Sequence, residues 1–149
     1  MPRIFQLEIV ILGVLALVLA ACSGSSDPTA VPASDTESTG LAKNADGYVD
    51  ISVQQLADML PNKDFTLVNT HIPFEGDLPQ TDVSIPYDRI ADNLDQLPAK
   101  DAPIVLYCRS GNMSTQAAKV LADLGYTNVM ELDGGFNAWK AAGYSMAGE

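Results

Sequence analysis

The stretch IVLYCRSGNMS, residues 104–114, decides how this chain folds. Its first four residues are apolar, β-branched or aromatic, and they predict a strand buried inside a domain. The run ends at Cys108, and a short polar loop that contains Gly111 follows. Beyond the loop, apolar residues recur at helical spacing and predict a helix over residues 114–124. The buried face of this helix is expected to carry Ala117, Val120, Leu121 and Leu124.

Cys108 is therefore expected where a strand ends and a helix begins. Backbone N–H groups of the loop and of the first helical turn can point at its sulfur, and the helix dipole also favours an anion there. Arg109 adds a positive charge beside it. These features favour the thiolate, the form that a nucleophilic cysteine needs. The alternative is that Cys108 is a small buried apolar residue, as many free cysteines are.

Strand and helix patterns alternate along residues 48–149. This alternation predicts an α/β domain of three layers, with a central, mostly parallel sheet flanked by helices. The predicted strands are residues 48–51, 65–69, 83–86, 104–107 and 128–132.

Two predicted helices precede the Cys108 strand. Ser52 and Gln55 match a capping box, and Pro61 ends the helix that they begin. Asp88 is expected to cap a second helix, which Pro98 ends. The inward side chains of this second helix are expected to be Ile90, Leu94 and Leu97.

Glycines mark the boundaries of the predicted helices that follow Cys108. Gly125 is expected at the C-terminal cap of the helix after the cysteine. Gly134 and Gly135 introduce a closing helix over residues 136–141 and would let two backbone segments approach closely under the cysteine loop. Trp139 in that helix is expected to fill the core rather than to bind a ligand.

Two motifs resemble those of single-domain rhodaneses. The first is YCRSGNMS, residues 107–114, and the second is ELDGGFNAW, residues 131–139, followed by Gly143. They occur in the order and at about the spacing of that family, and the resemblance covers roughly residues 47–146. It implies a rhodanese-like three-layer fold and a sulfurtransferase.

The resemblance implies that Cys108 takes sulfane sulfur from thiosulfate or a similar donor as a persulfide and passes it to cyanide or a thiol. No cofactor is expected. Backbone amides of residues 109–114 would hold the anion, with Arg109 as the cation. The expected substrate-binding residues are Arg109, Ser110, Gly111, Asn112, Met113 and Ser114.

Two other functions remain open from the sequence. Phosphatases and arsenate reductases of related fold use a Cys-x5-Arg loop, but the sixth residue after Cys108 is Ser114, which lacks the clamping guanidinium. A rhodanese-like module could instead carry sulfur, or bind a partner, without turnover. Met113 favours this alternative because many rhodanese loops have a basic residue there.

The segment 69–82 departs from the family pattern, which commonly has Asp-x-Arg and then a Gly-His-Ile-Pro-Gly-Ala-like turn. We therefore predict no catalytic residue within it. His71, the single histidine of the chain, is expected to be structural, although it could lie at the rim of the Cys108 site, at the carboxyl ends of the strands.

The N-terminus is predicted to be a lipoprotein signal peptide, residues 1–21. Arg3 precedes an apolar run over residues 9–21, which is too short to span a bilayer comfortably. The run ends in Leu-Ala-Ala before Cys22, and this ending resembles a bacterial lipoprotein signal. A plain transmembrane anchor is the alternative.

Lipidation of Cys22 would leave Cys108 without an intramolecular disulfide partner. Residues 22–47 are then the lipidated cysteine and a flexible linker rich in Ser, Thr and Pro, and residues 48–149 are the domain. We expect an exported protein, anchored by lipid to the outer face of the cytoplasmic membrane or to the outer membrane.

The charge balance restricts the partners. The net charge is −11, and no basic stripe suited to nucleic acid is present. One histidine and two cysteines, with no ligand-spaced cluster, argue against a metal site. We expect a monomer whose partners are a small sulfur-containing anion, a thiol acceptor and the membrane.

Overall fold

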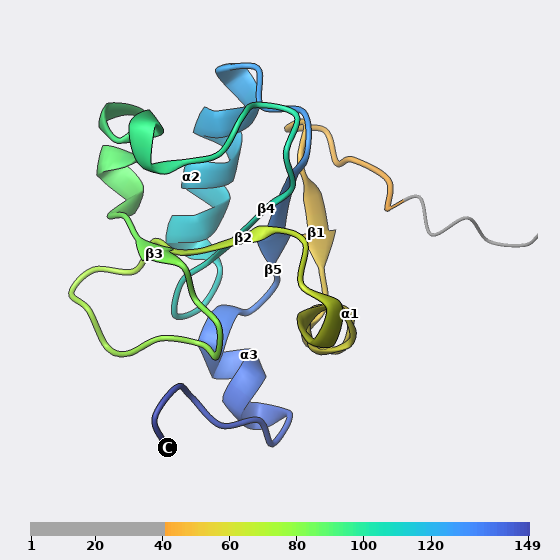
Figure 1. The fold of residues 1–149 in the computed structure, drawn as a ribbon, viewed down its shortest axis with the longest axis vertical. Coiled ribbons are helices and arrows are strands. Elements are labelled where there is room, and N and C mark those ends of the chain that lie inside the picture. Colours follow the sequence, from red (N-terminus) through yellow and green to blue (C-terminus); the bar gives the residue numbers. More distant parts are fainter. Residues whose placement is uncertain (1–40) are drawn as a thin grey trace, which may run out of the picture. The chain divides into compact units, whose positions relative to one another are not determined.

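Five short strands form a parallel sheet at the centre of the computed structural model, which describes residues 41–149 (Figure 1). The strand order is β1-β5-β4-β2-β3, and every neighbouring pair is parallel. The strands are β1 (Val49–Ile51), β2 (Thr66–Asn69), β3 (Val83–Ser84), β4 (Ile104–Tyr107) and β5 (Val129–Leu132). The predicted α/β fold with a central parallel sheet is confirmed.

The predicted signal peptide, Cys22 and the linker up to residue 40 lie outside the described residues. Their predictions therefore stay predictions. Within residues 41–149, the helices are too short or too polar to cross a membrane.

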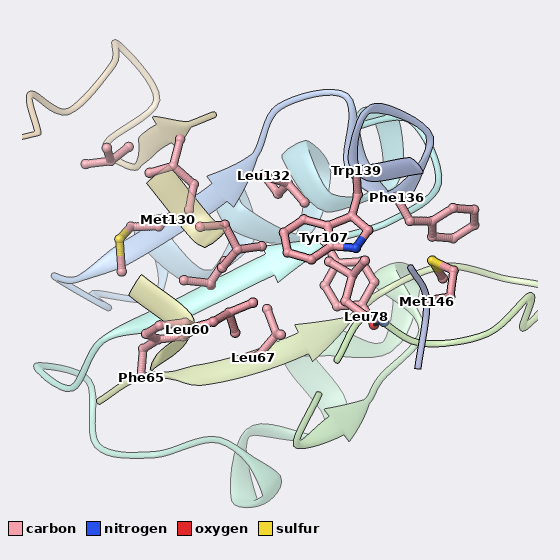
Figure 2. Close-up of a cluster of buried hydrophobic side chains, with 14 residues drawn as sticks. Leu60, Phe65, Leu67, Leu78, Tyr107, Met130, Leu132, Phe136, Trp139 and Met146 are labelled. Carbon is pink, nitrogen blue, oxygen red and sulfur yellow. Dashed lines mark hydrogen bonds between the residues drawn. The ribbon is translucent and has the colours of Figure 1, made fainter. Parts of the chain in front are cut away.

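Strand β4 is covered on both faces, so its side chains alternate between two cores. Ile104 and Leu106 join the cluster under α2 (Asn112–Asp123). Val105 and Tyr107 join the opposite cluster, which contains residues of α1 (Val53–Met59) and α3 (Gly135–Ala141). Figure 2 shows the second cluster, which contains both Tyr107 and Trp139. Trp139 is 3% exposed, so the predicted core role is confirmed.

The capping residues act largely as predicted. Ser52 Oγ accepts a hydrogen bond from the Gln55 N–H, and Gln55 Oε1 accepts one from the Ser52 N–H, which completes the capping box. Pro61 lies in a 3-10 turn directly after α1. Gly125 has a φ of 87° and follows α2, as expected of a C-terminal cap.

The prediction of a helix after Asp88 is wrong. The segment forms two 3-10 turns, Tyr87–Asp92 and Leu94–Gln96, and Pro86 rather than Asp88 precedes the first. Asn93 separates the turns because its side chain donates to the Arg89 carbonyl and competes with helical hydrogen bonding.

Burial in this region and at the end of α2 also differs from the prediction in part. Ile90 and Leu97 are buried as expected, and Leu94 is only partly buried. Leu124, predicted on the buried face of α2, is 37% exposed because the helix ends at Asp123 and Leu124 already belongs to its cap.

Candidate active site

Cys108 is the first residue after β4, at the carboxyl end of a central strand. It is 1% exposed, but it contributes to the wall of a pocket of about 230 Å³. The other residues that line this pocket are His71, Arg109, Ser110, Asn112 and Met113. The structure therefore gathers four of the predicted binding residues around the cysteine, together with the histidine.

The remaining two predicted residues contact the sulfur directly. Gly111 N–H donates to Cys108 Sγ at 3.2 Å, and Ser114 Oγ lies 3.3 Å from the same atom. Gly111 can turn its amide toward the sulfur because it adopts a φ of 94°, a conformation that favours glycine. Within residues 41–149 the Gly111 amide is the backbone donor to the sulfur. The sulfur is therefore in contact with fewer backbone amides than the predicted set from residues 109–114.

The start of α3 holds the cysteine loop from behind. Phe136 N–H donates to the Cys108 carbonyl at 2.9 Å, and Asn137 N–H donates to the Arg109 carbonyl at 3.0 Å. A Cβ atom at Gly135 would lie only 2.1 Å from the Cys108 carbonyl oxygen. The predicted close approach is confirmed, and it requires glycine at position 135.

An acidic residue that the sequence analysis did not identify lies at the pocket rim. Arg109 Nη1 lies 3.1 Å from Glu75 Oε1, and His71 Nε2 lies 3.3 Å from the same oxygen. His71 thus lies at the rim of the Cys108 site, the second of the two positions that its place after β2 allowed. Arg109, which is predicted to bind the substrate anion, forms an ion pair with this carboxylate.

The contacts of Glu75 stabilise its ionised form. The side-chain contact with His71 and the charge of Arg109 hold the pKa of Glu75 below its ordinary value of 4.5. The Glu75 side chain is 37% exposed and that of Arg109 is 52% exposed, so water competes for both groups. An incoming anion can therefore separate this pair at modest cost.

Residues at the ends of β2 and β4 hold, by hydrogen bonds, the loop that carries His71 and Glu75. The hydroxyl of Tyr107 accepts from the Leu78 N–H at 3.0 Å and donates to Asp77 Oδ1 at 3.1 Å. Asn69 accepts from the His71 N–H and donates to Asp77 Oδ1. The segment that departs from the family pattern is thus held by hydrogen bonds to the ends of β2 and β4, and its His71 lines the pocket.

A second unpredicted acid, Glu131, lies behind the cysteine. It belongs to β5 and is 2% exposed. Ser114 Oγ donates to Glu131 Oε1, so one hydroxyl touches both this carboxyl group and Cys108 Sγ. Burial raises the pKa of Glu131 to about 7, although the hydrogen bond from Ser114 opposes the shift. The available signal was a charged residue between two apolar residues inside a predicted strand of a sheet flanked by helices.

Other features of the described chain do not compete for this role. A larger hollow of about 330 Å³ between Leu41 and α1 is lined by Leu41, Gln55, Asp58 and Met59, and none of these residues carries a thiol or a hydroxyl group. Within residues 41–149, His, Cys, Asp and Glu side chains form no group of three that could hold a metal ion. The chemistry available here is that of one thiol with a hydroxyl, an amide and charged groups around it.

Comparison with known proteins places this site in context. Residues 52–142 match the model of the rhodanese-like domain. A sulfurtransferase of Allochromatium vinosum is 38% identical over 93 residues, which cover 60% of this chain and 82% of that protein. The thiosulfate sulfurtransferase GlpE of Pseudoalteromonas translucida is 30% identical over 101 residues, which cover 62% of this chain and 89% of that protein. A solved structure of a rhodanese-related protein from Thermoplasma volcanium matches with a TM-score of 0.60 and 27% identity, over 68% of this chain and 100% of that one.

Proposed function

The chain belongs to the rhodanese-like domain family, and we propose that it is a sulfurtransferase that works through a persulfide on Cys108. The observation that carries this proposal is the contact of one cysteine sulfur with both the Gly111 amide and the Ser114 hydroxyl at the wall of a pocket. Both groups can donate to the sulfur of the Cys108 thiolate, and they remain beside the inner sulfur when the persulfide forms.

The reaction has two transfers. The Cys108 thiolate attacks the outer sulfur of thiosulfate, an S–S bond forms to the cysteine, and sulfite leaves with the electrons of the broken bond. Cyanide or a thiolate then attacks the terminal sulfur of the persulfide and returns the Cys108 thiolate. With cyanide the product of this second transfer is thiocyanate, and no external oxidant or reductant is needed.

The pocket favours a small donor. Its volume of about 230 Å³ is below the roughly 300–1,000 Å³ of sites for drug-sized ligands. Arg109 would contribute the positive charge to a bound anion after it leaves Glu75. Met113 lines the pocket without adding charge, so we expect modest turnover with a dianion such as thiosulfate.

The test is the mass of the purified chain after treatment with thiosulfate. We expect an increase by one sulfur atom, located on the peptide that contains Cys108, and its removal by cyanide with formation of thiocyanate. Cys108→Ser should prevent the adduct and leave the circular dichroism spectrum unchanged. An adduct that no acceptor removes would favour the sulfur-carrier alternative. The absence of any adduct with thiosulfate or polysulfide would rule out the proposed chemistry.

A lipid anchor at Cys22 is the second part of the proposal. The motive is the apolar run of residues 9–21 followed directly by this cysteine. Palmitate labelling in a bacterial host should be lost in Cys22→Ser, which should also keep its signal peptide. Cys108→Ser is the matched control and should remain labelled. Labelling that persists in Cys22→Ser would contradict lipidation at this residue.

A further inference from the structure

Glu131 is a buried acid that the proposed sulfur transfer does not itself use. In the part of the chain that the structure describes, it forms no ion pair with a basic side chain, and its hydrogen-bond donor is Ser114. A buried carboxylate without a cation is costly, so such a group normally keeps its proton or gains strong donors.

Ser114 Oγ has three acceptors within reach and only one hydrogen to give. The acceptors are Glu131 Oε1, the Gly111 carbonyl at 3.1 Å and Cys108 Sγ at 3.3 Å. An ionised Glu131 competes strongly for that hydrogen because charge-assisted hydrogen bonds are about twice as strong as neutral ones. A protonated Glu131 can donate to Ser114 Oγ instead, which leaves the serine hydrogen for the sulfur.

Other charged groups around the two residues reinforce this competition. Asp50 is the register partner of Glu131 on β1, and Asp133 follows on the same segment. Both negative charges help burial to raise the pKa of Glu131, so its proton is held up to about neutral pH. The charged or titratable residues on the pocket side of Cys108 are Arg109, His71 and Glu75.

We propose that Glu131 is a positioning residue for Cys108, because its protonation decides whether the single hydrogen of the Ser114 hydroxyl goes to the sulfur or to the carboxylate. The Cys108 thiolate and the Glu131 carboxylate therefore exclude one another, and the two groups share one proton as a coupled pair. The active form has an anionic sulfur and a neutral Glu131.

This inference rests on the proposed function only for its role in sulfur transfer. When the thiolate becomes a persulfide, the negative charge moves to the outer sulfur and the leaving group takes the electrons of the broken bond. The proton on Glu131 is not consumed. Ser114 can therefore donate to the cysteine sulfur before and after the step.

The test is the pH dependence of Cys108 alkylation by iodoacetamide, a neutral reagent, in the purified full chain from about pH 5 to about pH 9. Glu131→Gln keeps a donor toward Ser114 but cannot ionise. We expect a lower inflection and faster alkylation above about pH 7, where Glu131 of the natural chain is ionised, by up to about tenfold, the ratio that one pKa unit gives. At the acid end of the range, where Glu131 is already protonated, the two rates should be equal. Asp133→Asn, which removes an exposed acid two residues away, should shift the profile much less.

Ser114→Ala separates the hydroxyl route from direct charge repulsion. In a double-mutant cycle, Glu131→Gln should accelerate alkylation clearly less when Ser114 is already alanine. An equal effect in both backgrounds would overturn the role of the hydroxyl. An inflection that stays unchanged in Glu131→Gln would overturn the proposal as a whole.

A second measurement covers the case in which Glu131→Gln does not fold. Carbon-13 NMR of labelled glutamate should show Glu131 titrating at lower pH in Cys108→Ser, because coupling between two protonation sites is reciprocal. An unchanged Glu131 titration would contradict the coupling. Neither measurement uses a sulfur donor, so their failure is distinguishable from failure of persulfide formation.

Discussion

Two glutamates lie on opposite sides of Cys108, and their surroundings shift their pKa values in opposite directions. Glu131 is buried behind the cysteine, and burial raises its pKa to about 7. Glu75 lies at the open rim, where contact with His71 and Arg109 lowers its pKa. A glutamate side chain is therefore suited to holding a proton at position 131 and a negative charge at position 75. The buried side should control the protonation of the sulfur, and the rim should control access of anions.

The largest expected difference between the two sides is the effect of pH on stability. Glu131 is protonated in both states below about pH 4.5, and between about 4.5 and 7 only the unfolded chain has lost the proton. Unfolding then releases a proton, so the free energy of unfolding should fall as the pH rises through this window. A shift from 4.5 to about 7 corresponds to an effect on the order of 3 kcal/mol, which is complete above about pH 7.

Urea unfolding at both ends of this window checks the expected loss of stability. Glu131→Gln should lose much less stability with rising pH than the natural chain. Asp133→Asn should lose nearly as much as the natural chain, because burial contributes more than Asp133 to the raised pKa of Glu131. An equal loss of stability in the natural chain and in Glu131→Gln would mean that burial does not perturb this carboxyl group.

The next effect in size is the loss of the shared hydroxyl. Ser114→Ala should destabilise the protein by about 1–3 kcal/mol, because it leaves buried partners at Cys108 and Glu131 without their donor. Ser110→Ala removes an exposed hydroxyl from the same loop and should change the free energy of unfolding by less than about 0.5 kcal/mol. Equal denaturant midpoints for the two variants would contradict the importance of the buried side.

On the rim, Arg109→Ala should reduce kcat/KM for thiosulfate about tenfold, because a charge-assisted contact to a dianion is lost. Met113→Ala should reduce it much less, since the thioether lines the same pocket without a charge. Steady-state kinetics of the two variants provide the comparison, and equal losses would show that Arg109 does not bind the anion.

The smallest effect is expected at Glu75. Glu75→Gln removes the charge that competes for Arg109, so kcat/KM for thiosulfate should rise about twofold to fivefold, in the range of exposed ion pairs. Asp92→Asn is the matched control because it breaks the exposed pair of Asp92 with Arg89, which does not line the pocket. A decrease in Glu75→Gln would mean that Glu75 orients Arg109 rather than blocks it.

Short-range signals in the sequence account for the architecture. An apolar run, a cysteine and an amphipathic segment predicted the path from β4 through the loop to α2, because burial and helical spacing are local patterns. Gly135 could be predicted as a close-approach position for the same kind of reason. The predicted helix after Asp88 failed because Asn93 satisfies a backbone carbonyl with its own side chain, an outcome that apolar spacing does not reveal.

The sequence by itself determined the α/β fold, the position of Cys108 and the residues of its loop. Only the tertiary structure decided which charges surround the sulfur. Glu131 meets Ser114 across 17 positions of the chain, and Glu75 meets Arg109 across 34. Such pairs form when the strand register and the hydrogen bonds that hold the loops bring distant residues together. Burial then decides whether a carboxyl group keeps or loses its proton. Neither the partner nor the burial of a charged side chain is encoded in the residues next to it.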